Sequence, residues 1–204
     1  MAAGSPASPA QRMTRAERER LIGDAATRLF ARQGYAATTV DDIVRAAGVT
    51  KPMLYRHWES KQELGIALFE RHREELVAAA LGVFDAGDSD RRGQVAIMAR
   101  AWFEHARQHP DATRFLNVPV TGDPELERVQ RDLHARQRAT LAALLRELAS
   151  GRPGAFSEAD AEAMGEAVRA SLAALALWRT DHPDVPGETL TGVLTRMVQG
   201  LIGI

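Results

Sequence analysis

The residue types best suited to a specific chemistry lie together in one short segment, Thr50-Lys51-Pro52-Met53-Leu54-Tyr55-Arg56-His57. If this segment is a helix, Val49, Leu54 and Trp58 share an apolar face. The opposite face then carries cationic, aromatic, hydroxyl and thioether side chains, those of Thr50, Lys51, Met53, Tyr55 and His57. Such a face is suited to contacts with phosphates and base edges in the major groove of DNA. In the alternative interpretation this is an ordinary solvated polar face, and the hydrogen bonds of the histidine are made within the protein.

Other kinds of chemistry find little support in the residue pattern. The sequence contains no cysteine, which excludes disulfides, thiolate metal sites and a cysteine nucleophile. It also lacks the G-x-S-x-G, P-loop, G-x-G-x-x-G and H-E-x-x-H motifs. His105 and His109 are four residues apart and could share a metal ion, but no third ligand accompanies them. We therefore predict that the protein is not an enzyme and has no cofactor or metal site.

Charge is distributed unevenly along the 204 residues. The formal net charge is −1, but residues 1–64 hold ten basic and seven acidic residues, or +3, and residues 65–204 hold 16 and 20, or −4. The only two lysines, Lys51 and Lys61, lie in the basic part. The excess of basic over acidic residues thus lies in the part of the chain that contains residues 50–57, as expected of an element that approaches phosphates.

Apolar residues recur with a helical period almost throughout and predict an all-α fold. Residues 1–13 are small, rich in proline and without periodicity, which predicts a disordered tail. Helices are predicted over residues 14–33, 39–47, 50–57, 60–84, 94–108, 111–117, 124–149, 157–180 and 187–200. We assign residues 14–60 to an N-terminal three-helix domain containing a helix-turn-helix, and residues 61–204 to a C-terminal helical domain. Capping residues support several of the helix starts, namely Thr39 with Asp42, Thr50, and Ser60 with Glu63.

Residues 38–64, TTVDDIVRAAGVTKPMLYRHWESKQEL, closely resemble the DNA-binding domain of the TetR family of bacterial repressors. The preceding segment FARQGY, residues 30–35, is similar to the same family, and the resemblance covers about residues 15–64. Two residues depart from the family pattern: Trp58 stands where phenylalanine is usual, and Val44 where a small residue is common. Both are apolar substitutions within the motif. Beyond this region the chain carries no family signature.

The resemblance implies particular contacts with double-stranded DNA. Residues that match the start of the family's recognition helix, Thr50, Lys51, Pro52 and Met53, approach base edges. Those matching Tyr55, His57 and Lys61 hold phosphates, and Thr39 caps a helix whose N-terminal amides face a phosphate. Arg45 is a further expected phosphate contact, and Arg56 completes the predicted DNA-binding set.

The resemblance also implies a homodimer formed through the last two long helices, here residues 157–180 and 187–200. The predicted interface residues are Val168, Leu172, Leu175, Leu190, Leu194, Met197 and Leu201. The same stripes could instead be intrachain core, because an apolar helical stripe does not reveal which partner covers it. A two-fold dimer would bind a palindromic operator.

By analogy with the family, the helices from residue 94 to 149 enclose a pocket for a small-molecule effector. The predicted lining residues are Met98, Trp102, Phe103, Phe115, Leu116, Asn117, Gln137, Leu141 and Trp178. Such a pocket suits a hydrophobic or aromatic molecule, although apolar and aromatic stripes are also typical of ordinary core.

We therefore predict a sequence-specific transcriptional regulator, a dimeric repressor released from its palindromic operator by a hydrophobic or aromatic effector. The N-terminus has no apolar signal-peptide core, and no segment is apolar enough to span a bilayer. We accordingly expect a cytoplasmic location and no membrane partner. The alternative is a helical protein-interaction or ligand-binding module without DNA-binding activity.

Overall fold

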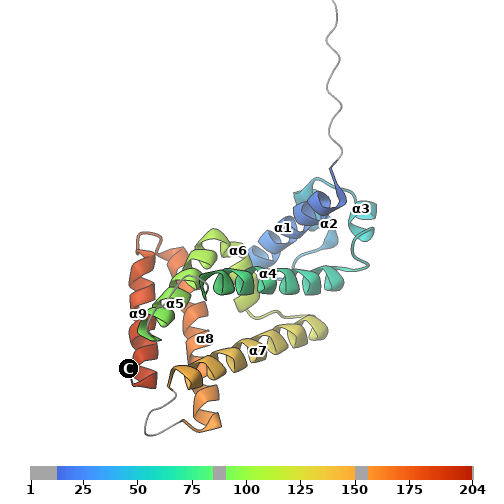
Figure 1. The fold of residues 1–204 in the computed structure, drawn as a ribbon. Coiled ribbons are helices and arrows are strands. Elements are labelled where there is room, and N and C mark those ends of the chain that lie inside the picture. The colour runs from blue at the N-terminus through green and yellow to red at the C-terminus, as the bar shows by residue number, and fades with distance from the viewer. Residues whose placement is uncertain (1–12, 85–90, 150–155, 204) are drawn as a thin grey trace, which may run out of the picture.

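The computed structural model describes residues 13–84, 91–149 and 156–203 (Figure 1). Within these ranges the chain is helical and contains no strand, as the sequence pattern predicts. The helices are α1 (Arg15–Gln33), α2 (Val40–Ala47), α3 (Lys51–Tyr55), α4 (Lys61–Phe84), α5 (Arg91–Gln108), α6 (Pro110–Asn117), α7 (Pro124–Leu148), α8 (Glu158–Asp181) and α9 (Gly187–Ile202). The predicted disordered tail lies outside the described residues, except for Met13.

Local side-chain caps determine where several helices begin. At α2 the predicted capping box is present: the Thr39 hydroxyl accepts from the Asp42 amide at 3.2 Å, and the Asp42 carboxylate accepts from the Thr39 amide at 3.0 Å. At α4 the Ser60 hydroxyl accepts from the Glu63 amide at 3.0 Å. Thr50 occupies the predicted N-cap position of α3, but its side chain makes no capping hydrogen bond.

The helices α1, α2 and α3 pack around an apolar core that continues into the rest of the molecule. Ile22 of α1, Ile43 of α2 and Leu54 of α3 have no exposed surface in this core. The same core includes residues of α4, α6 and α7, namely Leu64, Leu68, Phe69, Phe115, Leu116, Leu126 and Leu133. It therefore extends across the predicted domain boundary at residue 60.

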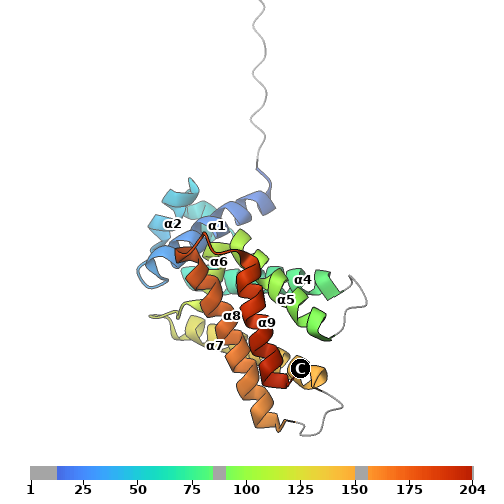
Figure 2. The ribbon, with the colours of Figure 1, turned by 90° about the vertical axis from the view of Figure 1, so that its left-hand side faces the viewer.

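A second apolar core lies among α5, α7, α8 and α9. The helices α8 and α9 run side by side on one face of the molecule (Figure 2). The helices α7 and α8 approach closely at Gly165, where an added Cβ would lie 2.6 Å from the Arg138 carbonyl oxygen and 3.0 Å from the Ala142 amide nitrogen. The absence of a side chain at residue 165 permits this approach.

The short helix α6 joins the two parts of the molecule. The Arg114 guanidinium donates to the carbonyl oxygen of Ala31 in α1 at 2.8 Å. The Phe115 ring stacks on Phe30 of α1, with centroids 5.3 Å apart, and on Phe69 of α4, with centroids 4.4 Å apart. Because of these direct contacts, a displacement of α6 would also shift α1.

Candidate nucleic-acid interface and ligand cavity

The turn between α2 and α3 fixes α3 at the outer end of the molecule (Figure 1). Gly48 has φ 65° and ψ 31°, the left-handed conformation that favours glycine. The Val49 amide donates to the Val44 carbonyl at 3.0 Å and closes the turn. The buried Leu54 holds the inner face of α3 against the core, so the opposite face is turned outward.

This outer face carries most of the residues predicted to contact DNA. Thr50, Lys51, Pro52, Tyr55 and Arg56 are exposed, and Met53 is half-buried. Tyr55 keeps 48% of its surface exposed although it is a large aromatic residue. The Arg56 guanidinium has no ion pair within the described part of the chain. The Arg56 guanidinium and the Tyr55 hydroxyl are thus available to acceptors on DNA.

Two predicted DNA-binding cations, Lys51 of α3 and Arg45 of α2, are paired with acidic residues of α2. The Lys51 ammonium lies 2.9 Å from the Asp41 carboxylate, and the hydrogen bond that it donates to that carboxylate raises the pKa of Lys51. Arg45 lies 3.3 Å from Asp42, and Thr39 and Arg45 are both exposed at the ends of α2. Because both ion pairs are exposed, DNA phosphates can compete for these cations at low energetic cost.

The structure corrects the expected position of His57. Its side chain is only 2% exposed, and its Nδ1 lies 2.9 Å from the Glu19 carboxylate of α1. The imidazole packs beside Trp58, with ring centroids 5.5 Å apart. Because α3 ends at Tyr55, His57 turns inward and anchors the end of the helix-turn-helix to α1.

Lys61 is likewise engaged within the protomer. Its ammonium donates to the carbonyl oxygens of Tyr35 at 3.0 Å and Thr38 at 2.8 Å, and it lies 4.1 Å from the centroid of the Tyr35 ring. Partial burial lowers the pKa of Lys61. In this structure Lys61 ties the loop after α1 to the start of α4, and these two bonds leave one of its three ammonium donors for a phosphate.

A largely apolar cavity of about 260 Å³ lies among α4, α5, α7, α8 and α9, close to the lower end of the roughly 300–1,000 Å³ typical of small-molecule pockets. Five of the predicted effector residues line it: Met98, Trp102, Asn117, Gln137 and Leu141. The Trp102 indole donates to the Leu172 carbonyl at 3.2 Å, which fixes the ring in the wall.

Four other predicted effector residues lie elsewhere. Phe115 and Leu116 belong to the core shared with α1, and Phe103 is buried in the second core without reaching the cavity. Trp178 remains 43% exposed and stacks on His182, with centroids 3.9 Å apart. Helical spacing identifies apolar positions but does not reveal whether a cavity, a core or solvent lies opposite.

Three of the seven predicted interface residues are covered within the protomer. Val168, Leu190 and Leu194 are buried within the protomer, and Val168 and Leu194 line the cavity. The remaining four, Leu172, Leu175, Met197 and Leu201, are half-buried against the second core. A side chain that is already covered by its own chain cannot form the centre of an interface.

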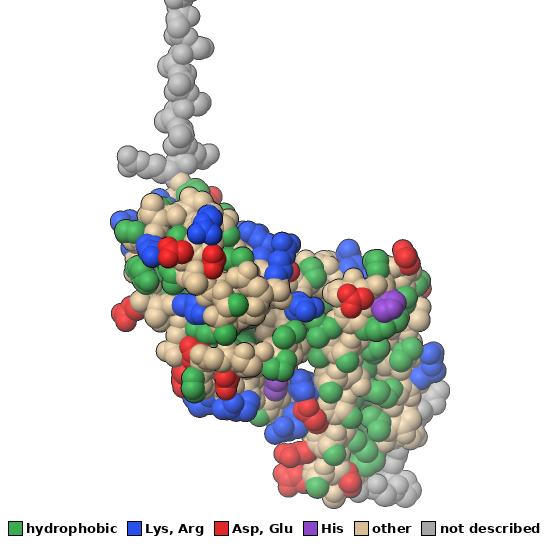
Figure 3. All heavy atoms as spheres, turned by 180° about the vertical axis from the view of Figure 1, so that it is seen from behind, with side chains coloured by type: hydrophobic (Ala, Val, Ile, Leu, Met, Phe, Trp, Pro, Cys, Tyr) green, Lys and Arg blue, Asp and Glu red, His purple; other side chains and the backbone are tan. Residues whose placement is uncertain are grey.

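The exposed apolar stripe of this face consists of residues outside the predicted interface set. They are Ala163, Ala167, Ala170, Ala174 and Trp178 of α8, with Val193 of α9. Their spacing of three and four places the α8 members on one side of the helix. Seen from behind, hydrophobic side chains form a band over this part of the molecule (Figure 3).

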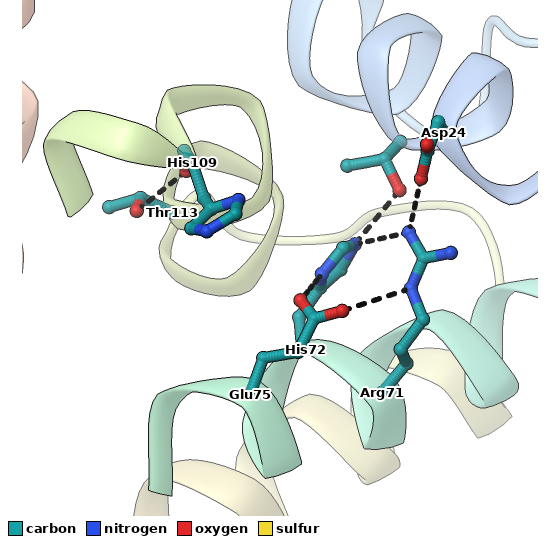
Figure 4. A network of polar contacts seen from close by, with 7 residues as sticks. Asp24, Arg71, His72, Glu75, His109 and Thr113 are labelled. Atoms are coloured by element: carbon teal, nitrogen blue, oxygen red, sulfur yellow. Dashed lines mark hydrogen bonds and ion pairs between the residues drawn. The ribbon is translucent and has the colours of Figure 1, made fainter. Parts of the chain in front are cut away.

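A polar cluster links α1 to α4 close to the start of α6 (Figure 4). The buried His72 of α4 lies with Nε2 2.9 Å from the Thr27 hydroxyl of α1 and with Nδ1 3.0 Å from the Glu75 carboxylate. The neighbouring Arg71 donates to the Asp24 carboxylate of α1 at 2.8 Å. Two adjacent residues of α4 therefore hold α1, and neither carried a sequence signal because the partners are more than 40 residues away.

Protonation of this cluster should destabilise the fold. Burial lowers the pKa of His72, and it also lowers the pKa values of His105 and His134. As the pH falls below about 6.5, the unfolded chain therefore takes up protons before the folded chain does. We expect the free energy of unfolding to decrease between pH 7 and pH 5, by at most about 1.4 kcal/mol per pH unit for each histidine.

Denaturant unfolding at several pH values measures this dependence. A His72→Gln variant should be less stable at pH 7 but should show a shallower pH dependence than the unaltered chain. Parallel curves for the two proteins would contradict the assignment to His72.

The described part of the chain shows neither a metal site nor a membrane-spanning helix. Across the described ranges, no group of three or more His, Cys, Asp or Glu side chains is arranged to hold a metal ion. The rings of His105 and His109 do lie together, with centroids 4.6 Å apart. None of the helices in the described part of the chain is both long and apolar enough to cross a bilayer.

Comparison with known proteins agrees with this geometry. A family model described as bacterial regulatory proteins, tetR family, matches residues 22–68, which include the whole helix-turn-helix. Over 105 residues the chain is 32% identical to the HTH-type transcriptional activator FasR of Mycolicibacterium smegmatis, covering 52% of this chain and 48% of that protein. Over 192 residues it is 26% identical to the HTH-type transcriptional regulator YhgD of Bacillus subtilis, covering 91% and 97%.

A solved structure extends the likeness to nearly the whole chain. The TetR-like transcriptional regulator from Rhodococcus sp. RHA1 has a TM-score of 0.77 at 25% identity, covering 95% of this chain and 100% of that one. The alignment with FasR spans only about half of that relative's length, whereas the Rhodococcus structure matches both parts of the fold.

Proposed function

Because the chain belongs to the TetR family of bacterial regulatory proteins, we propose that it is a dimeric repressor acting on a palindromic operator in the bacterial cytoplasm. It is a helix-turn-helix transcriptional regulator and not an enzyme. In our proposal, a small hydrophobic molecule binds the cavity and releases the DNA. The observation that carries this proposal is the outward face of α3 on a helix-turn-helix that α4 and α6 connect to an apolar cavity.

The route from the cavity to DNA runs through these two helices. Leu76 and Val77 of α4 line the cavity, and one turn earlier His72 is bonded to α1. Asn117 of α6 lines the cavity, and Arg114 of the same helix is bonded to α1. A ligand that displaces either helix changes the orientation of the helix-turn-helix. The ligand must bind the low-affinity conformer more tightly, by the coupling free energy that it produces.

The exposed stripe on α8 and α9 supports dimerisation through this face. Apolar side chains that lack a covering element within the protomer are stabilised by burial against a second copy. A two-fold axis there would place two α3 helices about one DNA turn apart, roughly 34–36 Å.

Two glutamates introduced into this stripe should abolish the dimer. The double substitution Ala170→Glu and Val193→Glu buries two carboxylates per protomer in the proposed interface, so we expect a monomer in sedimentation analysis and weaker operator binding. Ala143→Glu, at an exposed position on α7 outside the stripe, serves as the control and should remain dimeric. A double variant that still sediments as a dimer would place the interface elsewhere.

Selection of bound duplexes from a random DNA pool at fixed salt tests the proposed function. Enrichment of a two-fold palindrome is the expected result, and that sequence then serves to screen effectors by release from DNA. Folded protein that enriches no sequence, with or without candidate effectors, would favour the protein-interaction module. A reporter under the selected operator separates repression from the activation that the name of FasR describes.

A further inference from the structure

The cavity has a polar end and an apolar end. Along α7, the polar lining residues Arg136, Gln137 and Thr140 lie in the first half of the lining stretch, and every later lining residue is leucine, ending at Leu148. From Arg136 to Leu148 the helix rises roughly 18 Å. A molecule lying along α7 therefore meets polar groups at one end only.

The other charged lining residues, Arg73 and Arg169, come to the same polar end. His134 of α7 lies 3.0 Å from the Leu116 carbonyl oxygen, immediately before the lining residue Asn117, and it interacts electrostatically with Arg169 of α8. The start of α4 lies beside the start of α7, because a Cβ added at Gly65 would lie 3.1 Å from the Leu126 side chain, and the two helices run in the same direction (Figure 1). Arg73, about two turns after Gly65, therefore lies level with the part of α7 that carries His134 and Arg136.

Positive charge at this end exceeds the negative charge that is paired with it. Arg169 is engaged, because its Nε donates to the Glu166 carboxylate at 2.9 Å. The nearest carboxylate recorded for Arg73 is that of its neighbour Glu74, at 3.7 Å. Within the described ranges, the Arg136 guanidinium forms no ion pair. Arg73 and Arg136 are therefore available to an anion from outside the chain.

We propose that the effector is an amphiphile with one terminal anionic group, a carboxylate or a phosphate monoester, and an unbranched apolar body. Arg136, with Arg73, binds the anionic group at the mouth of the cavity, and the apolar body lies along the leucines of α7. A guanidinium presents paired donors that match the oxygens of either anion. This inference rests on the proposed function and narrows its effector from any hydrophobic molecule to an anionic one.

Calorimetric titration without DNA tests this charge preference. The ligands are decanoate, decyl phosphate, decan-1-ol and decyltrimethylammonium, all below their micelle-forming concentrations. The two anions should bind at least about tenfold more tightly than the alcohol, and the cation should bind most weakly. The anion that binds with the higher affinity, decanoate or decyl phosphate, identifies the preferred anionic group.

Two variants locate the contacts. Arg136→Ala should remove the advantage of the anions while leaving the affinity for decan-1-ol unchanged. Arg146→Ala, exposed on the same helix and outside the cavity wall, should retain the advantage. Ala101→Leu, which narrows the cavity, should weaken binding of the alcohol and the anions alike.

Equal affinities for decan-1-ol and decanoate would overturn the inference, as would an equal loss for both ligands in Arg136→Ala. Full binding by Ala101→Leu would also overturn it, because the ligand would then lie outside the cavity. If no ligand binds but a palindrome is still selected, the inference fails and the proposed function stands. If neither occurs, both fail.

Discussion

Replacing Lys51 and Tyr55 together by alanine should weaken operator binding at least about 100-fold. Both side chains are exposed on the outer face of α3, and neither belongs to the apolar core. A hydrogen bond to a charged phosphate contributes roughly 1.5–3 kcal/mol, and a dimer loses each contact twice. Titration of a labelled operator duplex at fixed salt measures the affinity. Thermal unfolding of the variant should be unchanged.

A substitution of the acidic residue beside Lys51 should instead strengthen operator binding. Asp41→Asn removes the exposed carboxylate that holds the Lys51 ammonium at 2.9 Å and that would repel phosphates. We expect operator binding to strengthen about two- to fivefold, in line with the roughly 0.2–1 kcal/mol of an exposed ion pair. Weaker binding would show that Asp41 positions Lys51 for DNA instead of competing with it.

The Gly165→Ala substitution should cost about 1–3 kcal/mol of unfolding free energy, the usual range for overpacking a core. The new methyl group would lie 2.6 Å from the Arg138 carbonyl oxygen and 3.0 Å from the Ala142 amide nitrogen. These are backbone atoms of a helix and cannot move independently, so α7 and α8 must separate. For a chain of this size each kcal/mol lowers the melting temperature by about 2–4 °C.

The matched control is Gly200→Ala in α9, where an added Cβ meets no atom within 4 Å in the protomer. Alanine favours a helix over glycine by about 1 kcal/mol, so this variant should melt at the same or a higher temperature. If Gly165→Ala and Gly200→Ala melt alike, α7 and α8 do not pack as tightly in solution as the structure indicates. Because Val168 and Arg169 follow directly on α8 and line the cavity, Gly165→Ala should also weaken ligand binding.

Helix positions were largely predictable from the sequence because their signals are local. The Thr39 and Asp42 pair begins α2, and Gly48 ends it with a left-handed turn. Tyr35 packs against Phe30 after α1, as expected of a hydrophobic contact beyond the helix end, with ring centroids 5.1 Å apart. The start of α5 was missed by three residues because Arg91, Arg92 and Gly93 carry no apolar period.

The candidate site was less predictable because it depends on which elements meet. A helical period correctly identified Leu54 as buried, but the prediction that His57 lies on the outer face was wrong because α3 ends two residues earlier. The large apolar residues of the α8 and α9 stripes were predicted to form an interface, with intrachain core as the alternative. Val168, Leu190 and Leu194 fill the protomer's own core, and most of the outward positions of α8 are alanines, which a period of large apolar residues does not single out.

The continuity of the first core has a consequence for engineering chimeric regulators. A DNA-binding module cut at residue 60 would lose Leu64, Leu68 and Phe69, which belong to the same apolar core as the buried residues of α1, α2 and α3. A transplant that carries α4 as far as Phe69 would still need a receiving surface that matches Phe115 and Leu126. Specificity can therefore be exchanged more safely by grafting the outer residues of α3 onto an intact chain than by swapping the whole module.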